Sequence, residues 1–511
     1  MFKNHPKGLL AAALANMGER FGFYTMMAIL SLFLMSKFGL TGSTAGIIYS
    51  IFYFSIYVLA FVGGLIADKT KNFKGTIFVG LILMAVGYFL IAIPTPTPVP
   101  AASFTLFLAM TCGGLFVIAF GNGLFKGNLQ ALVGQMYDKP EYSKMRDSGF
   151  SLFYMFINVG ALFAPLIAIG VRNWWVGLSG FKYNPDLPEL CHAHLGGTIS
   201  SDAAVNLQTL ATEVGFQGAD MTTFANEYLN VFATGFHYAF AVSIVAMFIS
   251  LVVYMVNKKK FPNPTIKEKA VGVQAGEMSV KEIRQRLYAL FAVFAVVIFF
   301  WFSFHQNGLT LTFFAKDYTD LSGIRLNLGF TELVGAEIFQ SVNPLLIVLL
   351  TPVVMAVFGA LRARGKEPST PKKIAIGMGI AACAYVLMAV GSMALPNKAA
   401  LTDMGGLPEI QRVTPFLLIG TYFILTIAEL FISPLGISFV SKVAPPKYQG
   451  MMQGLWLCAT AVGNSLLFIG AIFYESKTVS LSMTWTIFVV ACIISMTTML
   501  IMLKWLEKVA K

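Results

Sequence analysis

Charged residues are scarce in this sequence, and cysteine is scarcer still. Asp, Glu, Lys and Arg together make up 12% of the 511 residues, whereas hydrophobic residues make up 57%. Soluble domains carry about twice that share of charge, so the composition indicates a membrane protein with several spans. Of the five cysteines only Cys191 falls outside the apolar segments, so we predict no disulfide framework. No signal-peptide cleavage pattern follows the first apolar run, which we expect to remain in the protein.

Long apolar runs are abundant. Most exceed the ~20 residues that a spanning helix needs, so we predict an all-α polytopic membrane protein with twelve transmembrane helices. The predicted spans are 9–36, 42–68, 74–94, 104–137, 145–172, 232–257, 287–315, 333–360, 371–395, 414–441, 449–474 and 480–504.

The positive charges are unevenly distributed between the two sides of these spans. Of the 36 Lys and Arg residues, 26 lie at the termini or in loops on the same side, and 7 lie on the opposite side. Because basic loops stay in the cytoplasm, we predict a multi-pass protein of the cell (inner) membrane with both termini cytoplasmic. This distribution explains the net charge of +12 without a nucleic-acid partner. The expected partner is the lipid bilayer, and the expected functional unit is a monomer.

A basic segment divides the spans into two groups of six. Residues 258–286 begin with three lysines and are predicted to form a cytoplasmic linker, with a short amphipathic helix near Ser279–Tyr288. We therefore predict an N-terminal six-helix bundle in 1–257 and a C-terminal six-helix bundle in 287–511. Folds built from two such halves place their substrate site near the middle of the membrane, between the halves.

A second long connection is predicted on the external side, at residues 173–231. Ser200 and Asp220 are typical helix caps, and they precede predicted helices at 203–214 and 221–232. The segment Cys191-His192-Ala193-His194 offers fewer than the four ligands of a complete metal site, so we assign no metal.

Five ionisable residues lie well inside the spans: Glu19, Arg20, Lys126, His305 and Glu429. A charge near the membrane centre costs at least ~2.5–3.5 kcal/mol, so such residues usually face a bundle interior or a watery cavity. At 1.5 Å per residue they lie roughly 15–25 Å from the cytoplasmic helix ends and could meet in one cavity. Two cations from the first half and one carboxylate from the second suit a zwitterion. Arg20 and Lys126 would bind its carboxylate, and Glu429 its ammonium group.

Each of these residues also has a purely structural interpretation. Glu19 and Arg20 could form an ion pair that only fixes helix packing, and Glu429 could pair with a neighbouring helix. Lys126 could extend to the membrane interface. His305 could be a hydrogen-bonded core histidine, and the tyrosines near these charges could be packing residues.

Several motifs resemble the proton-dependent oligopeptide transporters of the major facilitator superfamily. Gly63–Lys69 resembles the cytoplasmic signature of that superfamily. The oligopeptide-transporter motifs are Glu19-Arg20-Phe21 with Tyr24, Gly-Leu-Phe-Lys126-x-Asn, Phe153-Tyr154-x-x-Ile157-Asn158-x-Gly160, Gln340-Ser341-x-Asn343-Pro344, Glu429-x-x-x-Ser433-Pro434-x-Gly436, and Gly454-Leu455-Trp456 followed by Gly463-Asn464.

The resemblance covers residues 15–465 in matching order. It implies a major facilitator fold and proton-coupled import of di- and tripeptides by alternating access, with the proton as coupling ion and no other cofactor. Arg20 and Lys126 would then bind the peptide carboxylate and Glu429 the amino end. By the same resemblance, the pocket would be lined by Tyr24, Tyr57, Asn158, Asn343 and Trp456.

The chain departs from the family pattern where protons are usually carried. Asn16 stands where the first-span motif usually has a second glutamate, Met27 replaces a common arginine, and His305 replaces the carboxylate of span seven. Losing the arginine and this carboxylate together avoids a buried unpaired charge. We predict Glu19 as the main proton site, because opening its pair with Arg20 favours the neutral carboxyl, and His305 as a second candidate.

Other functions remain open. The same fold could carry another small zwitterion or an anion, with altered or absent proton coupling. A membrane-embedded enzyme is disfavoured, because no intramembrane His/Asp or Ser/His pair occurs at a useful spacing. A scaffold protein that acts through the external segment is the third alternative.

Overall fold

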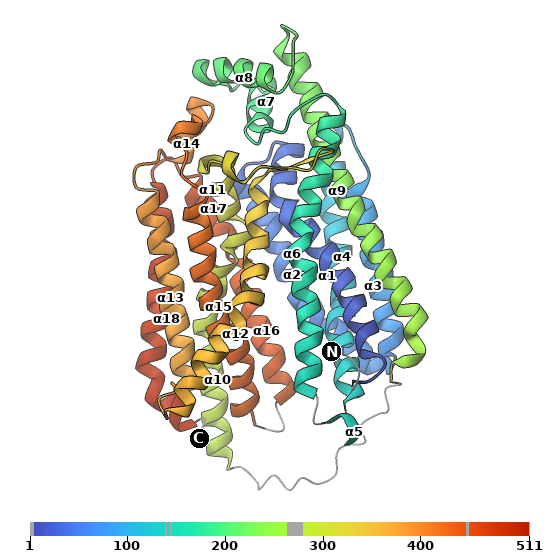
Figure 1. The fold of residues 1–511 in the computed structure, drawn as a ribbon, viewed down its shortest axis with the longest axis vertical. Helices are drawn as coiled ribbons and strands as arrows, with labels where there is room; N and C mark the ends of the chain where they lie inside the picture. Colours follow the sequence, from blue (N-terminus) through green and yellow to red (C-terminus); the bar gives the residue numbers. More distant parts are fainter. Residues whose placement is uncertain (1–4, 138–139, 144–145, 263–278, 446–448, 510–511) are drawn as a thin grey trace.

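The computed structural model describes residues 5–137, 140–143, 146–262, 279–445 and 449–509. Within them, twelve helical segments are long and apolar enough to cross a membrane, as the sequence predicts. The spanning helices form two bundles that stand side by side (Figure 1). The first bundle contains α1 (Leu9–Phe38), α2 (Gly42–Thr70), α3 (Phe73–Ala92), α4 (Phe104–Met136), α6 (Arg146–Leu178) and α9 (Met221–Asn257). The second contains α10 (Val280–Phe304) with α11 (Thr310–Tyr318), α12 (Val342–Ala363), α13 (Thr370–Gly391), α15 (Phe416–Val443), α16 (Gln449–Ser465) with α17 (Leu467–Tyr474), and α18 (Leu481–Val509).

The remaining elements are short. Most gather on the face opposite to the start of α1 and the end of α18, which we call the distal face (Figure 1). This face carries α7 (Leu187–Leu195), α8 (Ser201–Glu213) and α14 (Lys398–Met404). It also carries an antiparallel hairpin of β1 (Leu326–Asn327) and β2 (Glu332–Leu333). The other short elements are α5 (Pro140–Ser143) and six 3₁₀ segments, η1 (Ala101–Ser103), η2 (Lys258–Lys260), η3 (His305–Gly308), η4 (Ser322–Ile324), η5 (Ala336–Ser341) and η6 (Glu409–Gln411).

Two predicted separate helices are wrong. The predicted helix 221–232 is the first part of the 37-residue helix α9, which continues into span six without a break. The predicted amphipathic helix at Ser279–Tyr288 is the start of α10, where the Ser279 side chain accepts a hydrogen bond from the Glu282 amide as N-cap. In both cases the more polar segment is continuous with an apolar helix. Much of the predicted linker, 263–278, lies outside the described residues.

The predicted caps of the distal helices are present. The Ser200 hydroxyl accepts a hydrogen bond from the Ala203 amide at the start of α8, and the Asp220 carboxylate accepts one from the Thr222 amide at the start of α9. Such a side chain satisfies one of the four free N–H groups of a first helical turn.

Paired glycines bring α2 and α4 into backbone contact. A Cβ atom at Gly63 would lie 2.2 Å from the carbonyl oxygen of Gly123, and one at Gly123 would lie 2.4 Å from that of Leu59. Small residues allow such close packing of membrane helices, where dispersion contacts replace the hydrophobic effect as the main attraction. The contact fixes α4 beside α2 one turn before Lys126.

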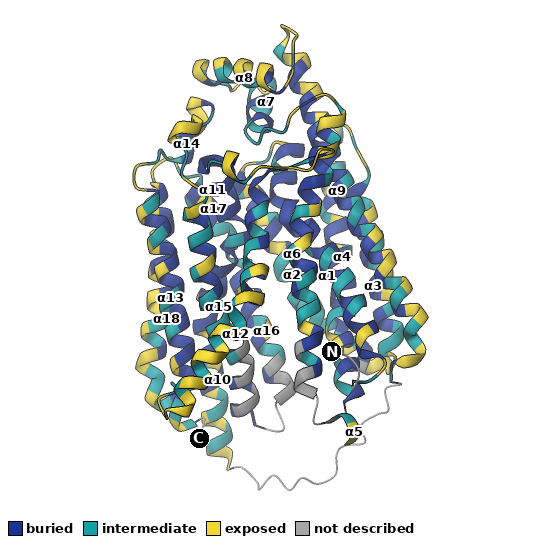
Figure 2. Cartoon of the chain, viewed as in Figure 1, coloured by how far each residue is buried: buried dark blue, intermediate teal, exposed yellow. Residues whose placement is uncertain are grey.

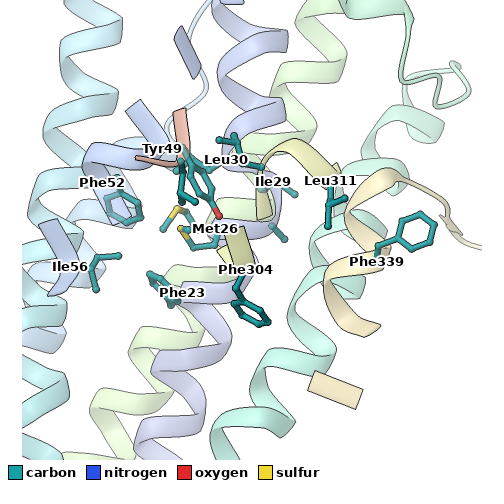
Figure 3. Packing of buried hydrophobic residues seen from close by; sticks show 14 of the residues in the cluster. Phe23, Met26, Ile29, Leu30, Tyr49, Phe52, Ile56, Phe304, Leu311 and Phe339 are labelled. Atoms are coloured by element: carbon teal, nitrogen blue, oxygen red, sulfur yellow. The ribbon is translucent and has the colours of Figure 1, made fainter. Parts of the chain in front are cut away.

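Buried apolar side chains fill the space between the bundles toward the distal face. They come from α1 and α2 on one side and from α10, α11 and η5 on the other (Figure 3). Each of them is at most 4% exposed: Phe23, Met26, Ile29, Leu30, Tyr49, Phe52, Ile56, Phe304, Leu311 and Phe339. Exposed residues lie mainly on the outward surfaces of the bundles and on α8 (Figure 2).

Candidate functional site

A cavity of about 310 Å³ lies between the two bundles, at the level where the sequence places the intramembrane charges. It is lined by α1, α2, α4 and α6 of the first bundle and by α10, η3, η5, α12, α15 and α16 of the second. Nine of the ten predicted site residues line it: Arg20, Tyr24, Tyr57, Lys126, Asn158, His305, Asn343, Glu429 and Trp456.

Glu19 is the exception, so the expectation that it faces the shared cavity is wrong. Its carboxylate is fully buried beside α4, where Asn122 Nδ2 donates to Oε1 at 2.6 Å. Arg20 holds the same carboxylate in a bidentate pair, with Nε to Oε2 at 2.5 Å and Nη2 to Oε1 at 2.6 Å. Neighbouring residues point ~100° apart around an α-helix. Arg20 therefore reaches the cavity while Glu19 lies behind it.

The Arg20 guanidinium stands between the cavity and this buried carboxylate. Its carbon lies 4.7 Å from the centroid of the Phe23 ring, which is a cation–π distance. A guanidinium has five N–H donors, and two of its nitrogens bind Glu19. The third, Nη1, is not used by Glu19 and can donate to a ligand in the cavity.

Lys126 approaches the cavity from α4. Its Nζ lies 4.9 Å from the centroid of the Tyr57 ring on α2, again at a cation–π distance. No carboxylate among the described residues forms an ion pair with this ammonium group. Because its nearest described partner is an aromatic face, the charge of Lys126 is available to an anion in the cavity.

Glu429 approaches the cavity from α15. Asn343 Nδ2 donates to Glu429 Oε2 at 2.9 Å and to Thr426 Oγ1 at 3.0 Å, which orients the carboxylate from α12. Within the described residues, no cation lies within ion-pair distance of Glu429. The cavity thus has cations on the wall of the first bundle and a carboxylate on the wall of the second.

His305 lies in the 3₁₀ segment that separates α10 from α11. Its Nδ1 lies 2.5 Å from Asn464 Oδ1, next to the break between α16 and α17. The ring stacks on Trp301 at 5.0 Å between centroids and lies 4.9 Å from the ring of Tyr53. This neutral hydrogen bond and aromatic packing agree with the core-histidine interpretation, although the ring also borders the cavity.

The other predicted residues supply walls of mixed polarity. Trp456 is buried and packs closely against Gly436, where a Cβ atom would lie 2.0 Å from Trp456 Cη2. Asn158 Nδ2 donates to the Tyr154 carbonyl of its own helix at 3.2 Å. Met27, one of the departures from the family pattern, also lines the cavity, whereas Asn16 does not.

Several lining residues were not predicted as site residues. Helical spacing could have identified Gln130 and Tyr154. Gln130 lies one turn from Lys126, and Tyr154 lies one turn from Asn158, each on the same helix face as its neighbour. Gln340 stands in a quoted motif, and its Nε2 donates to the Ala28 carbonyl of the other bundle at 3.2 Å. Nothing in the sequence marked Thr460 as part of the site.

The two histidines of α7 bind different groups. His192 Nε2 lies 2.8 Å from the carbonyl oxygen of Ser36, and His194 Nε2 lies 3.2 Å from Thr222 Oγ1. Within the described residues, no group of three or more His, Cys, Asp or Glu side chains is placed to hold a metal ion.

Comparison with known proteins identifies the family. The sequence profile of the POT family matches residues 74–280 and 272–487. The chain belongs to the POT family. It is 30% identical over 505 residues to the peptide transporter YePEPT of Yersinia enterocolitica subsp. palearctica serotype O:3 (strain YE-P4), which covers 95% of this chain and 91% of that protein. A di-/tripeptide transporter of Lactococcus lactis subsp. cremoris is 27% identical over 497 residues, covering 91% of this chain and 89% of that protein.

Solved POT-family structures share the fold. A crystal structure of peptide transporter POT in complex with sulfate superposes with a TM-score of 0.70 at 23% identity, covering 100% of this chain and 96% of that one. A POT-family transporter in complex with 5-aminolevulinic acid gives a TM-score of 0.71 at 21% identity, covering 100% and 98%. The protein therefore has the major facilitator fold, with two six-helix halves, and it is a membrane transporter rather than an enzyme.

Proposed function

We propose that this POT-family member is a proton-coupled symporter that imports di- and tripeptides by alternating access. The observation that carries the proposal is the charge arrangement of the cavity. Arg20 and Lys126 stand on one wall and Glu429 on the other, and within the described residues neither Lys126 nor Glu429 has an ion partner. Relatives named as peptide and di-/tripeptide transporters support this substrate class.

In this proposal the peptide neutralises the charges that the protein leaves unpaired. The carboxylate end binds Lys126 and the Nη1 group of Arg20, and the ammonium end binds Glu429, which Asn343 orients. Charge-assisted hydrogen bonds of this kind are worth about 1.5–3 kcal/mol each. Tyr24, Tyr57, Asn158 and Trp456 line the space between the two ends.

An uptake assay tests this binding mode. Proteoliposomes with a pH gradient would be offered either a dipeptide or its N-acetylated form. Glu429→Gln keeps an acceptor for Asn343 but removes the charge, so we expect dipeptide affinity to fall by about 10–100-fold. N-acetylation removes the peptide ammonium, so it should lower the affinity strongly in the wild type and only slightly in Glu429→Gln. An equal loss of affinity in both proteins would contradict the assignment of Glu429.

We also propose that the proton is the coupling ion and that no other cofactor takes part. A substrate carboxylate at Nη1 shares the positive charge of Arg20 with Glu19, and the weaker pairing would allow Glu19 to take up a proton. Access to Glu19 would then depend on Arg20, because Glu19 lies behind it. His305 is the second candidate, at the cavity wall.

Glu19→Gln tests this coupling role. Glutamine keeps one acceptor for Arg20 and Asn122 but cannot carry the proton, so we expect proton-driven accumulation to be lost while counterflow of dipeptide down its gradient persists. Comparison of the two assays on one preparation separates coupling from binding. Intact accumulation by Glu19→Gln would rule out Glu19 as the main proton site.

A second candidate function is transport of another small zwitterion or of an anion. A POT-family relative has been solved with 5-aminolevulinic acid, which also carries an amino and a carboxyl group. The same charge arrangement would accept such a ligand. Competition for uptake among dipeptides, ω-amino acids and simple anions distinguishes the candidates.

The finer localisation belongs to the same proposal. We place the protein in the cell (inner) membrane with both termini cytoplasmic, because of the 26-to-7 distribution of basic residues. We also propose that the monomer is the transporting unit, since both walls of the cavity come from one chain, although a relative has been solved as a tetramer.

A further inference from the structure

The ion pairs that join the two bundles gather at one end of the molecule. Within the described residues, every ion pair between the bundles lies at the distal face. One of them, between Arg172 on α6 and Glu337 on η5, is completely buried. The others involve the insertion between α6 and α9, residues 179–220, which contains α7 and α8.

Glu189 on α7 is the centre of the largest of these contacts. Its Oε2 accepts from Lys398 Nζ at 2.7 Å and from Lys316 Nζ at 3.3 Å, and both lysines belong to the second bundle. Asp317 lies on the other side of the lysines, 2.7 Å from Lys316 and 3.3 Å from Lys398. Thr402 Oγ1 donates to Glu189 Oε1 at 3.1 Å. Two positive and two negative charges thus balance, and three of the four side chains are less than 10% exposed.

Further contacts extend this connection along the insertion. Arg412 Nη2 donates to the Asp186 carboxylate at 2.5 Å. At the N-cap of α8, the Ser200 hydroxyl donates to the Asp403 carbonyl at 2.5 Å. Within α8, Asn206 Nδ2 donates to the Gly405 carbonyl at 2.5 Å. We call these contacts the distal latch: Asp186, Glu189, Ser200 and Asn206 of the insertion, with Lys316, Lys398, Thr402, Asp403, Gly405 and Arg412 of the second bundle.

The insertion itself is anchored to the first bundle. The Asn184 amide donates to Tyr228 Oη of α9 at 3.0 Å, and His192 Nε2 binds the Ser36 carbonyl at the end of α1. Leu187 and Cys191 are fully buried in α7, which packs against α9. The latch therefore joins the insertion, which is anchored to the first bundle, to α11, α14 and Arg412 of the second.

We propose that the distal latch is the gate that holds the distal face closed, and that its contacts must open for a substrate to enter from that side. The inference rests on the proposed transport function only in that alternating access requires the distal ends to separate. A cavity of about 560 Å³ lies directly at the latch, lined by Glu189, Lys316 and Lys398 together with Ser36 and Leu40 of the first bundle. Exposed residues such as Thr402 and Lys477 already line this space, so opening the latch would widen it.

The charge arrangement makes the latch reversible. When the insertion leaves, Asp317 stays with Lys316 and Lys398, so this cluster keeps one excess positive charge rather than two. The side chain of Glu189 is 33% exposed in the closed state, so water reaches it readily. Separating a partly exposed pair costs far less than leaving a fully buried charge without its partner, so this contact can break during each cycle.

Distances between spin labels at Leu178 and Met483 test the proposal. These residues are 64% and 60% exposed at the distal ends of α6 and α18, in different bundles and outside the latch. Labels would be placed on protein in nanodiscs after Cys112, Cys383 and Cys458 are replaced by serine, since the other two cysteines are buried. This readout needs neither peptide nor proton gradient, so its failure is distinct from failure of the proposed transport.

The latch predicts a shift toward longer distances when its charges are removed. We expect the longer-distance population to rise about tenfold over wild type in Glu189→Gln combined with Asp186→Asn, corresponding to loss of the charge-assisted contacts. The matched control is Glu213→Gln, an exposed carboxylate at the end of α8, which should leave the distribution unchanged.

A charge exchange separates gating from misfolding. Asp186→Arg alone should open the distal face, because it places a second guanidinium against Arg412. Asp186→Arg combined with Arg412→Asp should close it again, because this one-to-one pair regains opposite charges when the two residues are exchanged. Recovery by the exchanged pair would support the latch even if the single variant is less stable. An unchanged distance distribution in the Glu189→Gln, Asp186→Asn variant would overturn the proposal.

Discussion

At the scale of single residues, Lys126 is unusual because no carboxylate in the described part of the chain neutralises it. The ammonium group instead faces the Tyr57 ring and the cavity. A buried charge without a partner is costly to the fold, so its presence indicates a ligand that supplies the missing charge. The same argument applies to Glu429, whose described partners are neutral.

Lys126→Met should separate binding from stability. We expect dipeptide affinity to fall by about 10–100-fold because a charge-assisted contact is lost, while the unfolding temperature stays unchanged or rises because no acid loses a partner. Uptake kinetics and thermal unfolding of the purified protein measure the two effects. Lys372→Met, at an exposed position near the start of α13, is the matched control and should change neither. A loss of stability in Lys126→Met would mean that the lysine is structural.

The sequence predicts which charged residues matter but not how each one is oriented. Arg20, Lys126 and Glu429 were identified because charges inside apolar spans are rare and costly. The position of Glu19 depends on Asn122, 103 residues away, which holds its carboxylate against α4. Spacing along one helix places residues on a face, and only packing with the other helices decides which face borders the cavity.

At the scale of elements, the spans were predictable and their interruptions were not. The break at η3 contains no proline, and the segment is as apolar as an uninterrupted span. Tertiary hydrogen bonds satisfy the carbonyl groups that the break frees: Tyr385 Oη donates to the Ser303 carbonyl, and Tyr422 Oη donates to that of Asn307 at 2.7 Å. A hydropathy average over neighbouring residues contains no information on these distant partners, so it predicts one uninterrupted helix.

Gly123→Ala tests whether helix packing positions the site. The new Cβ would lie 2.4 Å from the Leu59 carbonyl, so α4 must move away from α2 and carry Lys126 with it. We expect a stability loss of about 1–3 kcal/mol, typical of overpacking, together with weaker dipeptide uptake. Gly113→Ala on the same helix is the matched control, because a Cβ there meets nothing within 4 Å. Equal behaviour of the two variants would argue against a positioning role for the glycine contact.

At the scale of the whole molecule, the membrane fold could be predicted from composition. The contact between the insertion 179–220 and the second bundle could not. Twelve apolar runs divided by a basic segment suffice to predict a membrane protein with two six-helix bundles, and the asymmetric basic loops predict its orientation. By contrast, Glu189 and Lys398 are separated by 209 residues, and both stand in polar connections without a periodic pattern. Their pairing depends on how the two bundles meet.

The pH response of the distal latch is the last prediction. Burial alone would raise the pKa of Glu189, but Lys398 and Lys316 outweigh it and hold the pKa well below its ordinary value. Burial would likewise lower the pKa of Lys398, but Asp317 and Glu189 outweigh it and raise that pKa. A carboxylate with a depressed pKa contributes its stabilisation above its unfolded value of about 4.3, and loses it only as the pH falls through the folded value. The latch should therefore keep its charges at every pH at which the transporter works.

We accordingly expect the Leu178–Met483 distance distribution to stay constant between pH 8 and about 6.5, the ordinary pKa of histidine. His192 borders the same cavity, and burial lowers its pKa, so it stays mostly neutral over this range. We then expect any pH dependence of peptide uptake in that range to come from the central site, either from His305 at the cavity wall or from Glu19 behind Arg20. An opening of the distal face between pH 8 and 6.5 in wild type, absent from Glu189→Gln, would instead make the latch itself the proton-sensitive element.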